Sequence, residues 1–331
     1  MIMGVSVVVP VYNSEQSLPL LIERLEPALD PYTREVEVIL VNDGSRDRSW
    51  NVIQRLTSAK EWIRGINLMR NSGQHNALLC GIRAARFETV VTIDDDLQNP
   101  PEEIPFLLQK LAEGFDVVYG TPLHQAHGLL RDLASTLTKI TLQKAMGSET
   151  ARNISAFRAF RTCLRDAFAH YRGSFVSIDV LLTWATTRFA SVPVRNDPRP
   201  IGQSNYTVRK LIIHALNMVT GFSTLPLEIA SVLGFLFMFF GAGLLAWVLG
   251  RWLLLGSVVP GFAFLASAIA IFSGVQMFAL GIMGEYLARM HSRLSDRPAY
   301  VVRELAACEL AGVEGRRQLQ EATEFHAERV L

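Results

Sequence analysis

The chain has 331 residues, of which 50% are hydrophobic and only 19% are charged, and its formal net charge is +1. Because an ordinary soluble domain carries about 25% charged residues, this composition excludes a disordered chain, a collagen-like fibre and a highly charged nucleic-acid binder. The three cysteines, Cys80, Cys163 and Cys308, lie far apart and form neither a disulfide framework nor a CxxC metal motif, which fits a reducing compartment.

The first 120 residues are predicted to alternate between strands and helices. Four short runs rich in β-branched residues, each followed by turn residues, indicate buried strands: Val5–Val9, Val36–Val41, Val90–Ile93 and Val117–Tyr119. Helical patterns lie between them, with a cap at Ser14, a cap at Ser45 or Asp47, and a third helix from Pro100-Pro101-Glu102-Glu103 to Gly114. This alternation predicts an α/β fold with a doubly wound, mostly parallel sheet.

Polar residues follow three of these strands directly: Tyr12-Asn13, Asn42-Asp43 and Asp94-Asp95-Asp96. Ligands of doubly wound sheets bind outside the carboxyl ends of the strands, so these residues are expected at one site. The sequence has no GxGxxG after the first strand and no GxxxxGK[ST], which argues against a dinucleotide site or a P-loop.

The acidic run 94–96 is the most informative of these strand ends. Three consecutive carboxylates repel one another and lose hydration when they are buried. A divalent cation relieves both effects, and Mg²⁺ or Mn²⁺ commonly takes one or two carboxylates together with phosphate oxygens of a substrate. Taken alone, the run could also be an exposed acidic turn in which Asp96 caps the following helix.

Two later segments show amphipathic helical spacing. Residues 128–147 carry Arg131, Lys139 and Lys144 opposite a row of leucines, and residues 207–224 form a second candidate, a juxtamembrane helix. Each could lie at a membrane surface or face a protein core.

Residues 211–288 contain only three formal charges, those of Glu228, Arg251 and Glu285. Ile229–Gly250 is uncharged over 22 residues, which corresponds to roughly 33 Å of helix and exceeds the ~30 Å hydrocarbon core. A second span is predicted from about Phe262 to 285. The alternative is a pair of buried helices in a large soluble core.

Basic residues flank this apolar hairpin: Arg209 and Lys210 before it, and Arg289, Arg293, Arg297 and Arg303 after it. The positive-inside rule therefore predicts both termini in the cytoplasm. The N-terminus lacks a basic region and Pro10 interrupts its apolar run, so no signal peptide is expected.

Beyond Val302 the pattern is helical. The predicted organisation is a cytoplasmic α/β domain over 1–206, the segment 207–224, two transmembrane helices within 225–288 (about 229–251 and 262–285) and a cytoplasmic tail over 289–331.

An ordered set of short motifs carries a family resemblance: Val9-Pro10-Val11-Tyr12-Asn13, Val41-Asn42-Asp43-Gly44-Ser45, Arg70-Asn71-Ser72-Gly73-Gln74, Asp94–Gln98 with its two prolines, Phe157-Arg158, and Arg199-Pro200-Ile201-Gly202-Gln203-Ser204. Through residues 5–210 the chain resembles family 2 glycosyltransferases of the GT-A fold. Within them it is most similar to the polyprenyl-phosphate glycosyltransferases, which include dolichol-phosphate mannose synthase and bacterial bactoprenol-phosphate glucosyltransferases.

The resemblance implies the donor side of a site. A nucleotide sugar would be held by Pro10, Tyr12, Asn13, Glu15, Asp43, Asn71, Gln74, Asp94 and Asp95. Mg²⁺ or Mn²⁺ would be held by Asp96 as the direct ligand, with Gln98 and Asp94 beside it. Asp96, Arg158 and Arg199 are the residues implied in catalysis.

The acceptor phosphate is expected at Arg131, Arg158, Arg199 and Ser204. A guanidinium fork suits a phosphate monoester. Many relatives carry a carboxylate just before the Phe-Arg pair, whereas residues 153–156 contain none, so a general base from this segment is not supported. None is required, because a phosphate monoester is already ionised near neutral pH, with a second pKa of about 6.

The expected reaction is one in-line displacement with inversion at the cytoplasmic face of a bacterial plasma membrane. It would transfer a sugar, with glucose favoured, from a UDP-sugar to undecaprenyl phosphate and give a β-linked lipid-phosphate sugar and UDP. UDP-N-acetylglucosamine, UDP-galactose, a 4-amino-arabinose donor and GDP-mannose stay open. Two other functions also stay open: a processive polysaccharide synthase, although QxxRW is absent, and a non-catalytic scaffold or flippase subunit. Small residues in the spans would permit a homo-oligomer.

Overall fold

The computed structural model describes residues 2–29, 33–122, 154–173, 176–198, 225–255, 261–295 and 297–307. The chain divides into two compact units, one formed by Met1–Val208 together with Arg297–Leu331 and the other by Arg209–Asp296. The helices predicted over 128–147 and 207–224 lie outside the described residues.

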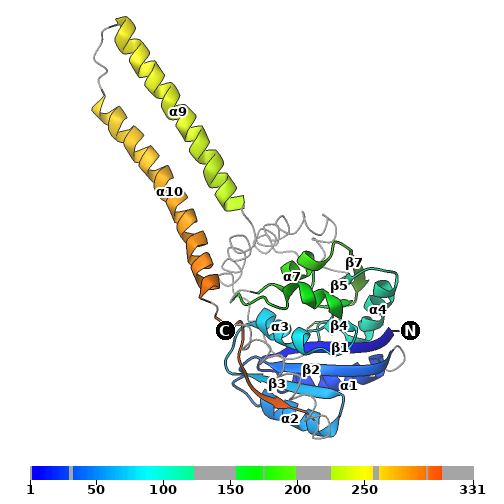
Figure 1. The fold of residues 1–331 in the computed structure, drawn as a ribbon. Coiled ribbons are helices and arrows are strands. Elements are labelled where there is room, and N and C mark those ends of the chain that lie inside the picture. Colours follow the sequence, from blue (N-terminus) through cyan, green and yellow to red (C-terminus); the bar gives the residue numbers. More distant parts are fainter. Residues whose placement is uncertain are drawn as a thin grey trace, which may run out of the picture. The chain divides into compact units, whose positions relative to one another are not determined.

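The first unit is built on one eight-stranded sheet of order β7-β5-β6-β4-β1-β2-β3-β8 (Figure 1). Its strands are β1 (Ile2–Val11), β2 (Thr33–Asn42), β3 (Ile63–Leu68), β4 (Thr89–Thr92), β5 (Val117–Pro122), β6 (Arg158–Arg161), β7 (Phe189–Val194) and β8 (Val302–Ala306). β4, β1, β2 and β3 run parallel, and β5 runs parallel to β7. β6 and β8 run antiparallel to their neighbours. The predicted α/β fold is confirmed, with antiparallel strands added to the parallel centre.

Helices cover both faces of this sheet. On β1, Val5, Val7, Val9 and Val11 join the core formed with α1 (Ser17–Leu29) and α4 (Ile104–Ala112). Val8 points to the opposite face, because side chains alternate along a strand. There it meets α3 (Gln74–Ala84), where a Cβ added to Gly81 would lie 2.3 Å from a Val8 methyl. Glycine therefore lets α3 approach the sheet closely.

The remaining elements of the first unit are α2 (Ser49–Ala59), η1 (Pro101–Glu103), η2 (Thr162–Phe168) and α7 (Ile178–Ala185). The strands and helices predicted up to residue 120 are confirmed, but α1 begins at Ser17 and α2 at Ser49, after the predicted caps. The helical pattern beyond Val302 is a wrong prediction for residues 302–306, which form β8. This strand pairs antiparallel with β3. The sheet is thus completed by residues that follow the apolar hairpin in sequence.

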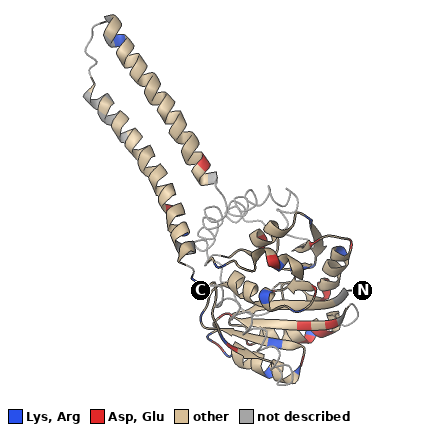
Figure 2. Ribbon diagram, viewed as in Figure 1, with Lys and Arg blue, Asp and Glu red and all other residues tan. Residues whose placement is uncertain are grey.

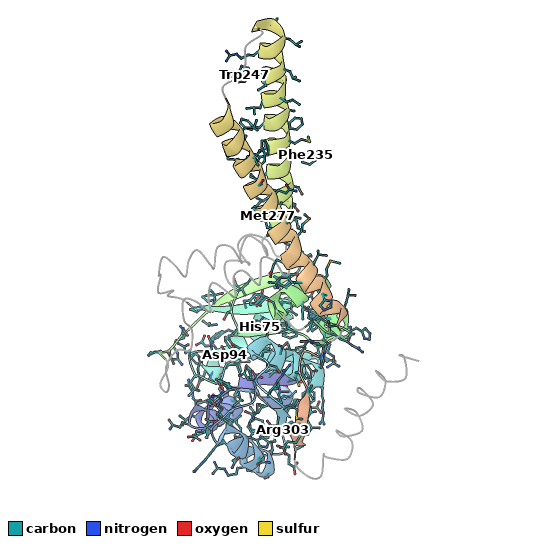
Figure 3. All side chains as sticks on the ribbon, turned by 90° about the vertical axis from the view of Figure 1, so that its left-hand side faces the viewer. His75, Asp94, Phe235, Trp247, Met277 and Arg303 are labelled. Carbon is teal, nitrogen blue, oxygen red and sulfur yellow. The ribbon has the colours of Figure 1, made fainter. Side chains whose placement is uncertain are left out.

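The second unit consists of two long apolar helices, α9 (Leu225–Leu255) and α10 (Phe262–Leu294). Charged residues are sparse along both (Figure 2). Pro226–Arg251 and Ile271–His291 are long and apolar enough to cross a membrane, and neither stretch is buried in the structure. Large side chains such as Phe235, Trp247 and Met277 are exposed along them (Figure 3). The second stretch lies within α10, which begins at Phe262, where the second span is predicted to begin; that this helix crosses a membrane stays a prediction.

Candidate active site

The carboxyl ends of β1 to β4 meet at one edge of the sheet. Chain order places β2 and β3 on one side of β1 and β4 on the other, so the order reverses between β1 and β4. Four of the five described residues with positive φ lie in the loops of this edge: Asn13, Gly44, Gly73 and Leu97. Positive φ is costly for the two residues that carry a Cβ, Asn13 and Leu97, and such strained residues concentrate at functional sites, so the loops are a candidate for one.

Asp94 lies just beyond β4, and its carboxylate accepts a hydrogen bond of 2.7 Å from the side-chain amide of Gln74. Burial, together with the charges of Asp96 and Asp95, raises the pKa of Asp94 to about 7. The buried Arg158 guanidinium opposes this shift. Asp94 and Gln74, predicted together on the donor side, are therefore in contact.

Asp95 connects β4 to the loop after β1. Its Oδ2 accepts hydrogen bonds from the Tyr12 backbone N–H at 3.2 Å and from the Ser14 hydroxyl. Burial raises the pKa of Asp95 to about 6 against the effect of these two bonds. In this geometry Asp95 holds the β1 loop across the point where strand order reverses. A direct contact of Asp95 with a donor stays a prediction.

The turn after Asp96 is set by the backbone of Leu97, the residue that follows it. Leu97 adopts φ 60° while its side chain is buried in the core. Asp96 Oδ1 accepts the Gln98 backbone N–H at 3.0 Å. The Gln98 carbonyl in turn accepts the Asp197 N–H at 2.8 Å, which brings the end of the described segment 176–198 to this motif.

The described residues contain no group of three or more His, Cys, Asp or Glu side chains arranged as a metal site. The carboxylates that are present nevertheless suit a divalent cation that also binds a phosphate-bearing substrate, because such a cation needs only one or two protein carboxylates. The charges of Asp95 and Asp96 help to hold the pKa of Asp94 well above its usual range, and a bound cation would relieve this repulsion. Asp96, Gln98 and Asp94 therefore stay the predicted ligands.

The loops after β1 and β2 are joined by hydrogen bonds. The Asn13 N–H donates to the Ser45 hydroxyl at 3.0 Å, and Asn13 Oδ1 accepts the Arg46 N–H at 2.8 Å. Glu15 accepts the Arg48 N–H at 3.0 Å. Pro10 is buried, whereas the Tyr12 side chain is 37% exposed. Tyr12 can therefore offer a ring face to a base, while Glu15 contributes to the loop; their contacts with a nucleotide stay predictions.

Asp43 holds the loop that precedes α3. Its carboxylate accepts the Ser72 N–H at 2.6 Å and the Gly73 N–H at 2.9 Å. Burial raises the pKa of Asp43, and these two bonds partly offset the rise. Asn71, in the same loop, is exposed. A carboxylate has about four acceptor positions, so Asp43 retains capacity for a ligand hydroxyl or amide.

Arg158, at the start of β6, is only 1% exposed. Its Nη1 pairs with Asp179, and its Nε donates to the Thr92 hydroxyl at 3.2 Å. Tyr119 donates to the same Asp179 carboxylate at 3.1 Å. This burial departs from the expectation of an arginine that faces an acceptor phosphate. A direct contact between Arg158 and the acceptor phosphate stays a prediction. The charge of the buried guanidinium acts on the acidic run 94–96, where it lowers the pKa of Asp94.

Arg131, Arg199 and Ser204, expected on the acceptor side, lie outside the described residues. Ser14 and Ser45, predicted as helix caps, instead bond loops of this edge: the Ser14 hydroxyl donates to Asp95, and the Ser45 hydroxyl accepts the Asn13 N–H. Asp179, Tyr119 and His75 were not predicted at this edge; His75 Nδ1 accepts the Ile178 N–H at 3.3 Å and links α3 to α7. Asp179 resembles an ordinary acid in the first turn of a helix, and only its buried arginine partner reveals its role.

Known proteins are similar to this chain over much of its length. Residues 6–171 match Glycosyl transferase family 2. An undecaprenyl-phosphate 4-deoxy-4-formamido-L-arabinose transferase of Pectobacterium carotovorum subsp. carotovorum is 35% identical over 306 residues, covering 92% of this chain and 94% of that relative. Its counterpart in Yersinia enterocolitica is 33% identical over 308 residues, covering 92% and 94%. Glucosyl-3-phosphoglycerate synthase from Mycobacterium tuberculosis matches with a TM-score of 0.47 and 19% identity, covering 66% of this chain and 76% of that one.

Proposed function

Because the chain belongs to glycosyl transferase family 2, we propose that it transfers a sugar from a nucleotide sugar to a polyprenyl phosphate at the cytoplasmic face of a membrane. The observation that carries the proposal is the acidic end of β4, which is bonded to the β1 loop in a chain that also has two helices long enough to span a bilayer. The 4-deoxy-4-formamido-L-arabinose transferases support it, since the match covers more than nine-tenths of each protein.

The proposed donor is a UDP-linked 4-deoxy-4-formamido-L-arabinose or a closely related 4-amino sugar. Glucose, the sugar favoured by the resemblance to bacterial two-span members of the family, has no support from the named transferases, whereas a 4-amino-arabinose donor is among the open alternatives. The nucleotide would stack on the exposed face of Tyr12 and bond to the remaining acceptor capacity of Asp43.

A divalent ion at Asp96, with Gln98 and Asp94 beside it, would neutralise the donor diphosphate and stabilise the departing nucleotide. The chain's own residues align the two reactants. Asp95 fixes the β1 loop, and Gln74 and Arg158 favour the ionised form of Asp94. An ionised lipid phosphate can then attack the anomeric carbon in line, with inversion and without a general base.

The acceptor phosphate is proposed to lie at Arg199, with Arg131 and Ser204 contributing. Asp197 is bonded to the Gln98 carbonyl, and Arg199 follows only two residues later in the sequence. Two residues of extended chain reach about 7 Å at most, so this bond supports an arginine close to the acidic motif. Arg158 would act on the acidic run from its buried position, through its positive charge.

The test is transfer of labelled sugar into lipid by membranes that contain the full chain. A panel of UDP-glucose, UDP-N-acetylglucosamine and UDP-4-deoxy-4-formamido-L-arabinose is offered with undecaprenyl phosphate, and the lipid phase is counted. We expect one sugar per lipid, with label only from the formamido pentose, and at least a hundredfold loss in Asp96→Ala. Label from glucose alone would overturn the donor assignment. A polymer, or full transfer by Asp96→Ala with metal chelated, would overturn the proposed reaction.

A further inference from the structure

We propose that Glu304, on β8, is a positioning residue for the donor edge and that it acts through a row of side chains across three strands. The inference rests on the proposed function, because the proposed function identifies this edge as a nucleotide site. The row itself is a feature of the structure, independent of the ligand. β8 and the labelled Arg303 lie at the β3 side of the sheet (Figures 1 and 3).

The row follows the strand register. Asn42 is the register partner of Asn67 between β2 and β3, and Asn67 is the partner of Glu304 between β3 and β8. Asn67 Nδ2 donates to Glu304 Oε1 at 2.8 Å, and Asn42 Nδ2 donates to Asn67 Oδ1 at 2.7 Å. Asn42 Oδ1 then accepts the Ser45 N–H at 3.4 Å. The row thus runs from the strand after the apolar hairpin to the turn after β2.

The groups at the two ends of the row determine which side chain donates and which accepts in each of its hydrogen bonds. A carboxylate can only accept, so Asn67 must turn its amide NH₂ toward Glu304 and its oxygen toward Asn42. A backbone N–H can only donate, so Asn42 must turn its oxygen toward Ser45. Both asparagines are buried, with exposures of 3% and 6%, so a reversed amide would leave polar atoms unpaired at substantial cost. Glu304 is the one side chain of the row that is exposed.

The row ends in the residues that shape the donor edge. Asn42 directly precedes Asp43, which holds the loop 72–73, and Ser45 accepts the Asn13 N–H of the β1 loop. A second link from the same segment reaches Met69, at the start of that loop. The Met69 N–H donates to the Val301 carbonyl at 2.8 Å, and Arg303 donates to the Met69 carbonyl at 3.4 Å. Residues 301–304 therefore support the turn after β2 and the loop after β3 together.

The test compares three variants of the full chain, purified in detergent. Glu304→Ala removes the acceptor, Glu304→Gln keeps an oxygen for Asn67, and Leu305→Ala removes a 39% exposed neighbour on β8 as a matched control. Two quantities are measured: the affinity for UDP with Mg²⁺, by calorimetry, and the hydrogen exchange of the segment 42–49. For Glu304→Ala we expect UDP binding to weaken about three- to tenfold and exchange over 42–49 to rise. Glu304→Gln and Leu305→Ala should stay within about twofold of the unaltered chain.

Unchanged exchange over 42–49 in Glu304→Ala would overturn the inference, and so would an equal effect from Leu305→Ala, which would assign the support to β8 as a whole. The two proposals fail in distinguishable ways. If exchange rises in Glu304→Ala but the unaltered chain does not bind UDP, the row stands and the nucleotide assignment fails. If UDP binds and exchange does not change, the row fails and the proposed function stands.

Discussion

Left-handed backbone at single residues shapes the edge where the parallel strands end. Gly44 has φ +64°, and a Cβ added there would lie 2.5 Å from the Asn71 backbone nitrogen. Gly73 has φ +96°, but a Cβ there would meet nothing within 4 Å. Substitutions at these two glycines therefore test different effects: backbone strain alone at Gly73, and backbone strain together with a steric clash at Gly44.

Gly44→Ala is expected to cost more stability than Gly73→Ala. Gly73 has φ 96° and ψ 151°, a combination essentially restricted to glycine, and placing a residue with a Cβ there should cost about 1–3 kcal/mol, which is the expected loss for Gly73→Ala. Gly44→Ala adds the clash with the 70–71 backbone and should cost at least about 1 kcal/mol more, with weaker UDP binding. Thermal unfolding and calorimetry in detergent measure both effects. Equal losses in the two variants would show that the loops can separate without cost.

The buried pair of Arg158 and Asp179 makes a second prediction at this scale. Asp179→Ala leaves the guanidinium buried without its partner and should destabilise the first unit by about 3–5 kcal/mol. Replacing both residues by leucine should recover much of this loss while transfer stays impaired, because Arg158 also favours the ionised form of Asp94. Unfolding and transfer assays on the single and double variants provide the check. A double variant as unstable as Asp179→Ala would contradict the assignment of the loss to an unpaired charge.

At the scale of strands and helices, the sequence predicted elements whose own composition marks them. β1, β2, β4 and β5 are rich in β-branched residues, and α1, α2 and α4 have recognisable starts. β3 was missed because it contains Arg64, Gly65 and Asn67, and β6 because it has only four residues with a charge at each end. In both strands the charge is neutralised by a distant partner, Glu37 for Arg64 and Asp179 for Arg158. Such pairs are invisible to local pattern.

The same distinction between local and distant signals applies to the residues of the site. Motif order brought out Asp43, Gln74 and the acidic run 94–96, which do lie at one edge and contact neighbouring loops. Ser14 and Ser45, which hold these loops, have a local signal only as helix caps, and nothing near them in sequence indicates their bonds to Asp95 and to the Asn13 N–H. Their roles arise only when strands distant in sequence become neighbours.

The close approach of α3 to the sheet supplies a prediction for an element. Gly81→Ala would place a methyl 2.3 Å from Val8 and should cost about 1–3 kcal/mol through overpacking. Val8→Ala combined with Gly81→Ala should recover part of that loss, since the second change makes room for the first. A double-mutant cycle by chemical unfolding measures the coupling energy. Strict additivity would show that α3 shifts as a whole instead of pressing on Val8.

For the whole molecule, the position of β8 matters most. The chain leaves the first unit, forms two apolar helices and returns to add the last strand beside β3. Because β8 belongs to the same sheet, the catalytic domain and residues 297–307 must lie on the same side of any membrane that the hairpin crosses. An unpaired β3 edge would expose hydrogen-bonding groups and invite association.

A chain cut after residue 224 should therefore aggregate, whereas a chain in which a long Gly/Ser linker replaces residues 225–296 should stay soluble and bind UDP. The second variant keeps β8 and loses the apolar helices. It should transfer poorly to acceptor lipid in vesicles, because it no longer holds its site at the bilayer. Light scattering after size-exclusion chromatography, with UDP calorimetry, compares the two. A monomeric, UDP-binding cut chain would show that β8 is dispensable.

The late position of β8 in the chain also sets an order of events during synthesis. Domains generally fold from the N-terminus as they leave the ribosome. Residues 302–306 emerge only after both α9 and α10 have been translated. The donor edge therefore receives Glu304 only after α9 and α10 have been synthesised, and until then the β3 edge of the sheet lacks its partner strand.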